Sequence, residues 1–203
     1  MHALGVLFST RSGDDATPAT RYGMSDRLPV DAQLVALAKE DRDAAFELLY
    51  NAYRGRIFTF LLHLAGSSEA ADDLVQDTFI KAHGAMARLD RDQKLLPWLY
   101  RIANNTAIDG LRRRKRFIWL PWVAIHGTPE EPQATDDQAT ARDRAEIAET
   151  LRRLPPDNAA ALLLHALEGY SYQEIAAIQG CSLTAARSRI ARARAAFREQ
   201  YPA

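Results

Sequence analysis

The most constraining feature of this chain is a pair of short helical segments that meet at a glycine near the C-terminus. Gly180 can adopt the positive φ that ends a helix, and Ser182 is a favoured N-cap for a helix that follows. Beyond Ser182, apolar residues recur every three or four positions and predict an inward-facing stripe of Leu183, Ala186, Ile190, Ala193 and Phe197. The arginines of this segment fall off that stripe. The pattern predicts a helix-turn-helix, residues 171–194, whose second helix has a basic outer face.

A short helix, a glycine turn and an arginine-rich helix form the unit that lays its second helix in the major groove of double-stranded DNA. Arginine can bind guanine through two hydrogen bonds, or pair with a phosphate. The best groove-facing candidates are Arg187, Arg189 and Arg192, with weaker contacts expected from Thr184 and Ser188. The alternative is a pair of packed helices with solvated arginines. Cap, turn, stripe and basic face agree with one another, and they favour DNA binding.

Composition allows a packed core and narrows the cellular setting. The chain has 203 residues, a length that suits one ordinary domain or two small ones, and 47% of them are hydrophobic, so a packed core can form. Cys181 is the single cysteine, so no intrachain disulfide can form. Apolar runs stop well short of about 18 residues, and residues 1–25 do not resemble a signal peptide. We therefore expect a cytoplasmic protein with no membrane insertion of its own.

Helical periodicity runs from Asp31 onward and no β-pattern is visible, which predicts an all-α fold. We expect two small helical domains, at 26–116 and 143–203, joined by a flexible linker at 117–142 and preceded by a disordered tail at 1–25. The linker carries three prolines and a glycine. Met24 is an alternative start of the chain.

Glycine, serine and proline residues inside the two domains predict where helices begin and end. Gly66 ends one helix, and Ser67 or Ser68 caps the next. A polar loop is expected from Leu89 to Leu96, with Pro97 opening a helix that runs from Trp98 to about Arg116. The sequence Leu154-Pro-Pro156 is expected to break the helices of the second domain.

The net charge is zero, with 26 basic and 26 acidic side chains, but the charges are segregated. A basic block occupies residues 112–116, while residues 130–149 are mainly acidic. Asn104, Asn105 and Thr106 are poor helix formers in a helical segment, each costing about half a kcal/mol against Ala, which suggests hydrogen bonding either to bases or to a neighbouring side chain that they hold in place. Trp98 and Tyr100 could stack on unpaired bases, with core packing as the alternative and the favoured one for Trp98.

Nothing in the sequence predicts catalysis. The five histidines have no metal-ligand spacing, and there is no glycine-rich phosphate loop, nucleophile–base arrangement or paired-carboxylate motif. We expect no metal, no cofactor and no enzymatic activity.

Four segments together resemble the bacterial RNA polymerase sigma factors of the extracytoplasmic-function (ECF) class. They are Asp72-Asp-Leu-Val-Gln-Asp-Thr-Phe79, the run from Trp98 to Arg114, Leu154-Pro-Pro156, and the run from Gly169 to Arg194. The resemblance covers about residues 35–116 and 145–200. Each segment alone is moderately specific, but their order and spacing together are highly specific.

The resemblance implies roles that composition does not show. It implies a region 2 bundle that docks on the coiled coil of the polymerase's largest subunit through Asp72, Asp73, Gln76 and Asp77. It implies that the helix beginning at Trp98 melts the −10 element. The separated DNA strand is then expected to lie near Lys94, Trp98, Asn104, Asn105, Asp109, Arg112 and Arg113. It implies that the helix-turn-helix is region 4, which reads the −35 duplex. Core RNA polymerase, promoter DNA and an anti-sigma factor are the implied partners.

Two other classes of protein are alternatives to this one. A stand-alone helix-turn-helix regulator would use the same basic helix, but it needs neither the Trp98–Arg114 segment nor an acidic docking helix. A nucleic-acid-processing enzyme lacks its catalytic constellation here. The sequence therefore favours a subunit that directs RNA polymerase to promoters.

Overall fold

The computed structural model describes residues 29–90, 94–117 and 147–200. All the regular elements in these ranges are helical, and this confirms the all-α prediction. The helices with assigned bounds are α2 (Pro29–Glu40), α3 (Arg42–Ala65), α4 (Ser68–Ala85), the 3₁₀ turn η1 (Met86–Arg88), α5 (Leu95–Phe117), α7 (Pro156–Ala166), α8 (Tyr172–Gln179) and α9 (Leu183–Gln200). The predicted tail at 1–25, and all of the predicted linker after Phe117, lie outside the described residues.

The first group of helices, α2 to α5, has boundaries that local side chains explain. Asp41 caps α3 by accepting from the backbone N–H groups of Asp43 and Ala44. Gly66 ends α3 in the left-handed conformation, with φ at 78°, and donates its N–H to Leu62. Ser67 then accepts from the N–H of Ala70, 3.3 Å away, and caps α4 as predicted.

Helix α5 begins at Leu95, so the expected polar loop through Leu96 is wrong at its end. Leu95 and Leu96 are buried, and burying two leucines in the core favours starting the helix before the proline. Pro97 lies in the first turn, where the missing N–H would have no helical partner.

The second group comprises a helical segment at 147–153 followed by α7, α8 and α9. Pro155 and Pro156 separate the first two of these, as the sequence predicts. Ser171 and Glu174 form a reciprocal capping box at the start of α8. Gly180 ends α8 with φ at 61°, and Ser182 accepts from the N–H of Ala185 at the start of α9.

The predicted inward stripe of α9 is buried, apart from the half-buried Leu183 at its start. Ala186, Ile190, Ala193 and Phe197 are each no more than 1% exposed. They pack mainly on α7 and α8, which fixes the opposite face of α9 toward solvent.

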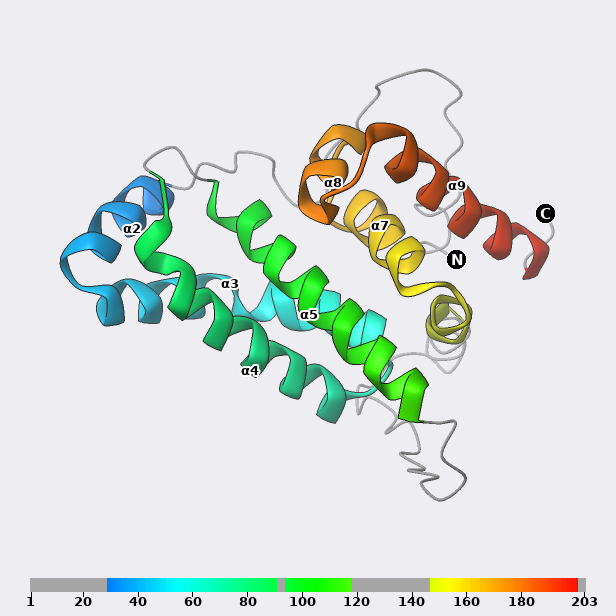
Figure 1. Ribbon diagram of the computed structural model, residues 1–203, viewed down its shortest axis with the longest axis horizontal. Coiled ribbons are helices and arrows are strands. Elements are labelled where there is room, and N and C mark those ends of the chain that lie inside the picture. Colours follow the sequence, from blue (N-terminus) through cyan, green and yellow to red (C-terminus); the bar gives the residue numbers. More distant parts are fainter. Residues whose placement is uncertain (1–28, 91–93, 118–146, 201–203) are drawn as a thin grey trace, which may run out of the picture.

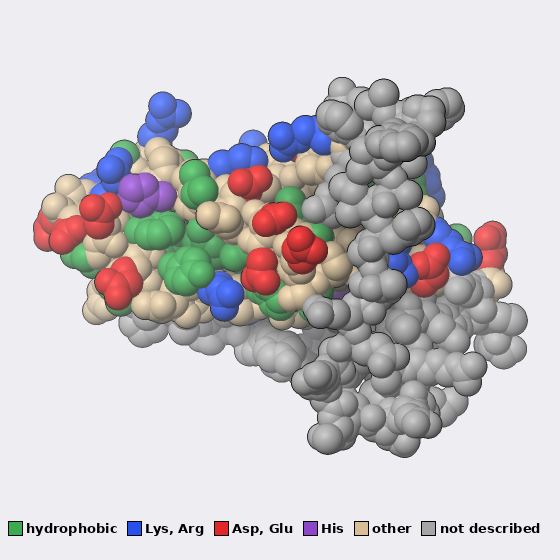
Figure 2. All heavy atoms as spheres, turned by 90° about the horizontal axis from the view of Figure 1, so that it is seen from below, with side chains coloured by type: hydrophobic (Ala, Val, Ile, Leu, Met, Phe, Trp, Pro, Cys, Tyr) green, Lys and Arg blue, Asp and Glu red, His purple; other side chains and the backbone are tan. Residues whose placement is uncertain are grey.

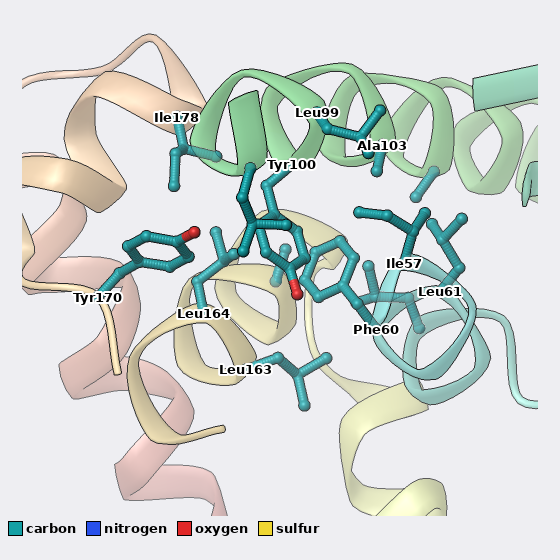
Figure 3. Close-up of a cluster of buried hydrophobic side chains, with 14 of the residues drawn as sticks. Ile57, Phe60, Leu61, Leu99, Tyr100, Ala103, Leu163, Leu164, Tyr170 and Ile178 are labelled. Carbon is teal, nitrogen blue, oxygen red and sulfur yellow. The ribbon is translucent and has the colours of Figure 1, made fainter. Parts of the chain in front are cut away.

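The two groups of helices share one hydrophobic core. Helix α5 lies against α7 and α8, and α3 also contacts α7 (Figure 1). Tyr100 of α5 occupies the junction, with its ring 5.3 Å from that of Phe60 and 5.7 Å from that of Tyr170 (Figure 3). The sequence predicts two helical domains, and it gives no sign that they pack directly on each other.

Candidate nucleic-acid interface

The predicted DNA-reading side chains of α9 differ in accessibility. Thr184, Arg187 and Arg192 are exposed, and Ser188 is half-buried. The Arg187 guanidinium lies 5.7 Å from the centre of the Tyr172 ring, a cation–π contact that orients it without blocking its donors. These residues leave a basic, hydrogen-bonding surface on one side of the helix.

Arg189 is held more firmly than its neighbours. Its side chain is 23% exposed, its Nη1 donates to Gln179 Oε1 at 2.7 Å, and its Nη2 lies 3.4 Å from an Asp157 carboxylate oxygen. A guanidinium has five N–H donors, so these contacts fix the group and still leave donors unused. Sequence reasoning missed both Gln179 and Asp157, because they approach Arg189 from other helices.

Helix α5 presents a line of polar side chains to solvent. Asn105, Asp109, Arg112 and Arg113 are exposed along it, and Lys94 is exposed just before its start. The Nε of Arg113 donates to the Asp109 carbonyl oxygen at 3.4 Å. The line has the hydrogen-bonding capacity of a surface that binds a nucleic-acid strand.

Three other candidates on α5 face inward to different degrees. Asn104 is 1% exposed; its side-chain Nδ2 donates to Asn105 Oδ1 at 3.3 Å, and its side-chain Oδ1 accepts from Gln179 Nε2 of α8 at 3.4 Å. Trp98 is half-buried and packs against the core, as favoured from the sequence. Tyr100 is fully buried, so the alternative that it stacks on bases is wrong for this arrangement.

Burial also explains the ionisation of the groups around Tyr100. Burial raises the pKa of its phenol, and the nearby Glu168 carboxylate raises it further. Burial is the largest single influence on the pKa of Arg56 and would lower it, but the 2.9 Å hydrogen bond to Glu168 and the charge interactions with Tyr100, Glu168 and Tyr170 together outweigh that effect, and the pKa is raised. Arg56 and Glu168 therefore form a charged pair between α3 and the loop after α7.

The predicted docking residues lie together on α4. Asp72, Asp73, Gln76 and Asp77 are all exposed, and Asp72 pairs with Arg54 of α3 at 3.6 Å. Figure 2 shows acidic side chains gathered beside an apolar patch on one face of the molecule.

Beside these acids lies a groove of about 340 Å³ between α3 and α4, and its lining is largely apolar. It is lined by Phe46, Tyr50, Arg54, Asp72, Val75, Gln76, Phe79 and Ile80. Ile80 is 62% exposed, the most exposed of the large apolar side chains in the described part of the chain. Ile80 was not among the site residues predicted from the sequence, although its position outside the buried stripe of α4 indicates an exposed apolar side chain.

The described residues hold no group of three or more histidine, cysteine, aspartate or glutamate side chains that could bind a metal ion. No helix among them is long and apolar enough to cross a membrane.

Comparison with known families defines the class to which this arrangement belongs. The model of Sigma-70 region 2 matches residues 49–117, and the model of Sigma-70 region 4 matches residues 144–197. The chain belongs to the sigma-70 family of RNA polymerase sigma factors, in its ECF class.

Individual relatives are similar in sequence to this protein over most of its length. It is 35% identical over 176 residues to the RNA polymerase sigma-H factor of Pseudomonas aeruginosa, covering 82% of this chain and 91% of that protein. It is 33% identical over 183 residues to the ECF RNA polymerase sigma-E factor of Escherichia coli K12, covering 86% and 95%.

A solved structure shows the same fold in a complex. The sigma factor RpoE of Bartonella quintana, crystallised with the anti-sigma factor NepR, superposes with a TM-score of 0.64 at 28% identity. The match covers 76% of this chain and 94% of that one. The resemblance drawn from the sequence is confirmed, while the roles of individual residues stay predictions.

Proposed function

We propose that this chain is a promoter-specificity subunit that binds core RNA polymerase, reads the −35 duplex with α9 and melts the −10 element with α5. One observation carries the proposal. The two matched regions occur in one chain, and they contain the acidic α4 face, the polar line of α5 and the basic face of α9. A stand-alone regulator would need only the last of these three surfaces.

Region 4, predicted at 143–203, supplies double-strand recognition. The exposed Arg187 and the oriented Arg189 have the donor geometry for guanine edges in the major groove. Arg192, Thr184 and Ser188 add contacts to phosphate or bases.

Region 2, predicted at 26–116, supplies strand opening. Unstacking a base costs a few kcal/mol, and the cost is offset when the extruded base is held by hydrogen bonds and apolar contacts. The exposed line of α5 offers amide, carboxylate and guanidinium groups for that strand, with Asn105, Arg112 and Arg113 the most accessible. Lys94 and Trp98 lie at the end of α5 where the strand would enter.

Docking on polymerase is assigned to the α3–α4 groove and its acidic border. Asp72, Asp73, Gln76 and Asp77 favour a basic partner surface, and Ile80 offers an apolar anchor at the centre of that contact. Chemistry at the growing RNA is left to the polymerase, so the chain itself is assigned no catalytic residue. We place it in the cytoplasm, where polymerase and promoter DNA are found.

The proposal also includes control of the chain by an anti-sigma factor. Its support is the Bartonella quintana relative, whose solved complex contains an anti-sigma factor. Co-purification from native cells tests this part, and recovery of the free monomer alone would count against it.

Run-off transcription tests the proposed activity. Purified core polymerase is incubated with genomic fragments, with and without the chain. We expect discrete transcripts only when the chain is present. A set of transcripts unchanged by its addition would exclude the sigma-factor role. Specific DNA binding without transcripts would support the stand-alone regulator instead.

A further inference from the structure

Tyr172, the first residue of α8, contacts an arginine that is proposed to read the −35 duplex. The central guanidinium carbon of Arg187 lies 5.7 Å from the centre of the Tyr172 ring. Arg187 is exposed on α9, whereas Tyr172 is half-buried and packs against the core. The contact therefore joins two helices that pack on each other (Figure 1).

The Tyr172 ring is itself held in place from α7. The imidazole of His165 stacks on it, with the two ring centres 4.9 Å apart and the ring planes at 22°. His165 is 8% exposed, and its Nδ1 lies 2.9 Å from the Tyr170 carbonyl oxygen. Because a carbonyl oxygen can only accept, Nδ1 carries the proton in this contact, which fixes the direction of the imidazole.

The backbone that carries Tyr172 is fixed as well. Ser171 Oγ accepts from the backbone N–H of Glu174 at 3.3 Å, and the Glu174 carboxylate accepts from the Ser171 N–H at 2.9 Å. This reciprocal cap sets the start of α8. Ring and backbone are thus both held by contacts within the second group of helices.

A cation–π contact restrains a guanidinium without occupying its donors. The aromatic ring attracts the positive charge as a whole, so the five N–H groups of Arg187 stay available. In the described part of the chain no hydrogen bond or ion pair occupies them. Arg189 differs, because it already donates to Gln179 at 2.7 Å. Of the two oriented arginines, Arg187 is the one whose direction depends on a ring.

Orientation decides which DNA group an arginine selects. A mobile guanidinium can pair with a phosphate, and phosphate contacts carry no sequence information. A guanidinium that is restrained before binding loses less rotamer freedom when it forms two hydrogen bonds to a guanine. The ring of Tyr172 therefore favours the contact of Arg187 with a base edge.

We propose that Tyr172 is a positioning residue for Arg187, and that its ring strengthens the base preference at the −35 base pair that Arg187 reads. The inference rests on the proposed function for the role of Arg187 as a reader of the duplex. Exposed cation–π contacts are weak. Loss of the ring should therefore lower the preference at that one base pair by about two- to fivefold and leave the others unchanged.

The motion of the Arg187 side chain in the free chain tests the contact without DNA or polymerase. Nitrogen relaxation in solution gives an order parameter for each arginine Nε–H group. Arg187 should be more ordered than the exposed Arg192. Tyr172→Leu should lower the order of Arg187 to that of Arg192, and Tyr172→Phe should preserve it because the ring remains. Equal order in wild type and Tyr172→Leu would overturn the proposal.

Base preference is measured on core polymerase carrying the full chain. The complex binds a pool of DNA duplexes with a randomised segment, the retained duplexes are sequenced, and core polymerase alone gives the background. Arg187→Ala identifies the base pair whose preference depends on Arg187. Tyr172→Leu should lower the preference at that same base pair by about two- to fivefold, and Tyr172→Phe should keep it.

Combined variants separate positioning from a general effect on the fold. In an Arg187→Ala background, Tyr172→Leu should change nothing further at that base pair, whereas in an Arg189→Ala background its effect should persist. A loss of preference at every base pair, an unchanged preference, or no enriched sequence with wild type would each contradict the positioning role. The relaxation measurement needs neither DNA nor polymerase, so its failure is distinguishable from a failed run-off assay.

Discussion

Arg187, Arg189 and Arg192 lie on one helix but are held differently, and this predicts different mutational effects. Arg189 is fixed by Gln179, and Arg187 rests on Tyr172, whereas no contact of this kind orients the exposed Arg192 in the described structure. Oriented guanidinium groups suit base edges, and a mobile one suits phosphate.

In the polymerase complex, Arg187→Ala or Arg189→Ala should each cost about 1–3 kcal/mol on the preferred −35 sequence and relax its specificity. Arg192→Ala should weaken all duplexes equally and reduce the salt dependence of binding. Competition binding over a panel of −35 variants measures both effects. Unchanged sequence preference in the Arg187→Ala, Arg189→Ala double variant would refute the assignment.

His165 makes folding stability depend on pH. Burial lowers its pKa below the ordinary 6.5; the hydrogen bond to the Tyr170 carbonyl opposes this shift, and Arg194 adds to it. Below about pH 6.5 the unfolded chain therefore binds a proton that the folded chain does not. The contribution is complete above pH 6.5 and is lost as the pH falls.

Urea denaturation between pH 7.5 and 5.5 should show stability falling toward acid, and His165→Asn should flatten part of that slope. His63→Gln, a change at a histidine on the α3 surface, is the matched control. An equal slope in wild type and His165→Asn would show that His165 does not contribute to the pH dependence of folding stability.

At the scale of elements, Gly180 and Gly55 have contrasting backbone conformations and predict opposite effects of substitution by alanine. Gly180 has φ at 61° at the end of α8, with no atom within 4 Å of the position that a Cβ would occupy, so only backbone strain opposes a side chain there. Gly55 lies inside α3 and also has open space around that position.

Gly180→Ala should destabilise the protein by about 1–2 kcal/mol, and Gly180→Asn by less, because asparagine tolerates the left-handed region. Gly55→Ala should instead stabilise it by about 0.5–1 kcal/mol, because alanine is the better helix former. Thermal denaturation followed by circular dichroism measures all three. A stabilising Gly180→Ala would mean that the turn does not need its positive φ in solution.

Most helix boundaries could be predicted because their signals are local. Gly66, Ser67, Gly180 and Ser182 each act within three or four residues of their position, so the sequence alone is enough to interpret them. The start of α5 could not be predicted in this way, because the burial of Leu95 depends on helices elsewhere in the chain.

The packing of the two regions is harder to predict for the same reason. Arg56 and Glu168 meet although 112 residues separate them, and Asn104 meets Gln179 across 75. Hydrophobic periodicity within a helix carries no information about a contact between residues so far apart in the sequence. The candidate DNA residues could be chosen from the sequence, but the contacts that cover Asn104 and hold Arg189 required the tertiary structure.

At the scale of the whole molecule, the groove between α3 and α4 should be the polymerase contact. Ile80→Asp places a charge on an exposed residue of its lining, where folding stability should change by no more than about 0.5 kcal/mol. Affinity for core polymerase should fall at least about tenfold, because a central apolar anchor is lost.

Leu48→Asp is the matched control, since Leu48 is 49% exposed on α3 and does not line the groove. Association with core polymerase can be followed by fluorescence anisotropy. Equal losses for the two variants would show that the effect is not specific to the groove.

The whole molecule also explains how a neutral chain can bind DNA. Its 26 basic and 26 acidic side chains cancel in sum, but the basic face of α9 and the acidic face of α4 are separate surfaces. Local potential governs binding, so each surface can attract a partner of opposite charge.

The most direct test of the central claim is promoter opening by core polymerase carrying this chain, measured by permanganate reactivity of −10 thymines on a promoter found by run-off transcription. The wild-type chain should make those thymines reactive. An Asn105→Ala, Arg112→Ala, Arg113→Ala variant should still protect the −35 element but leave the thymines unreactive. Full reactivity with that variant, or none with the wild-type chain, would contradict the division of work between α5 and α9.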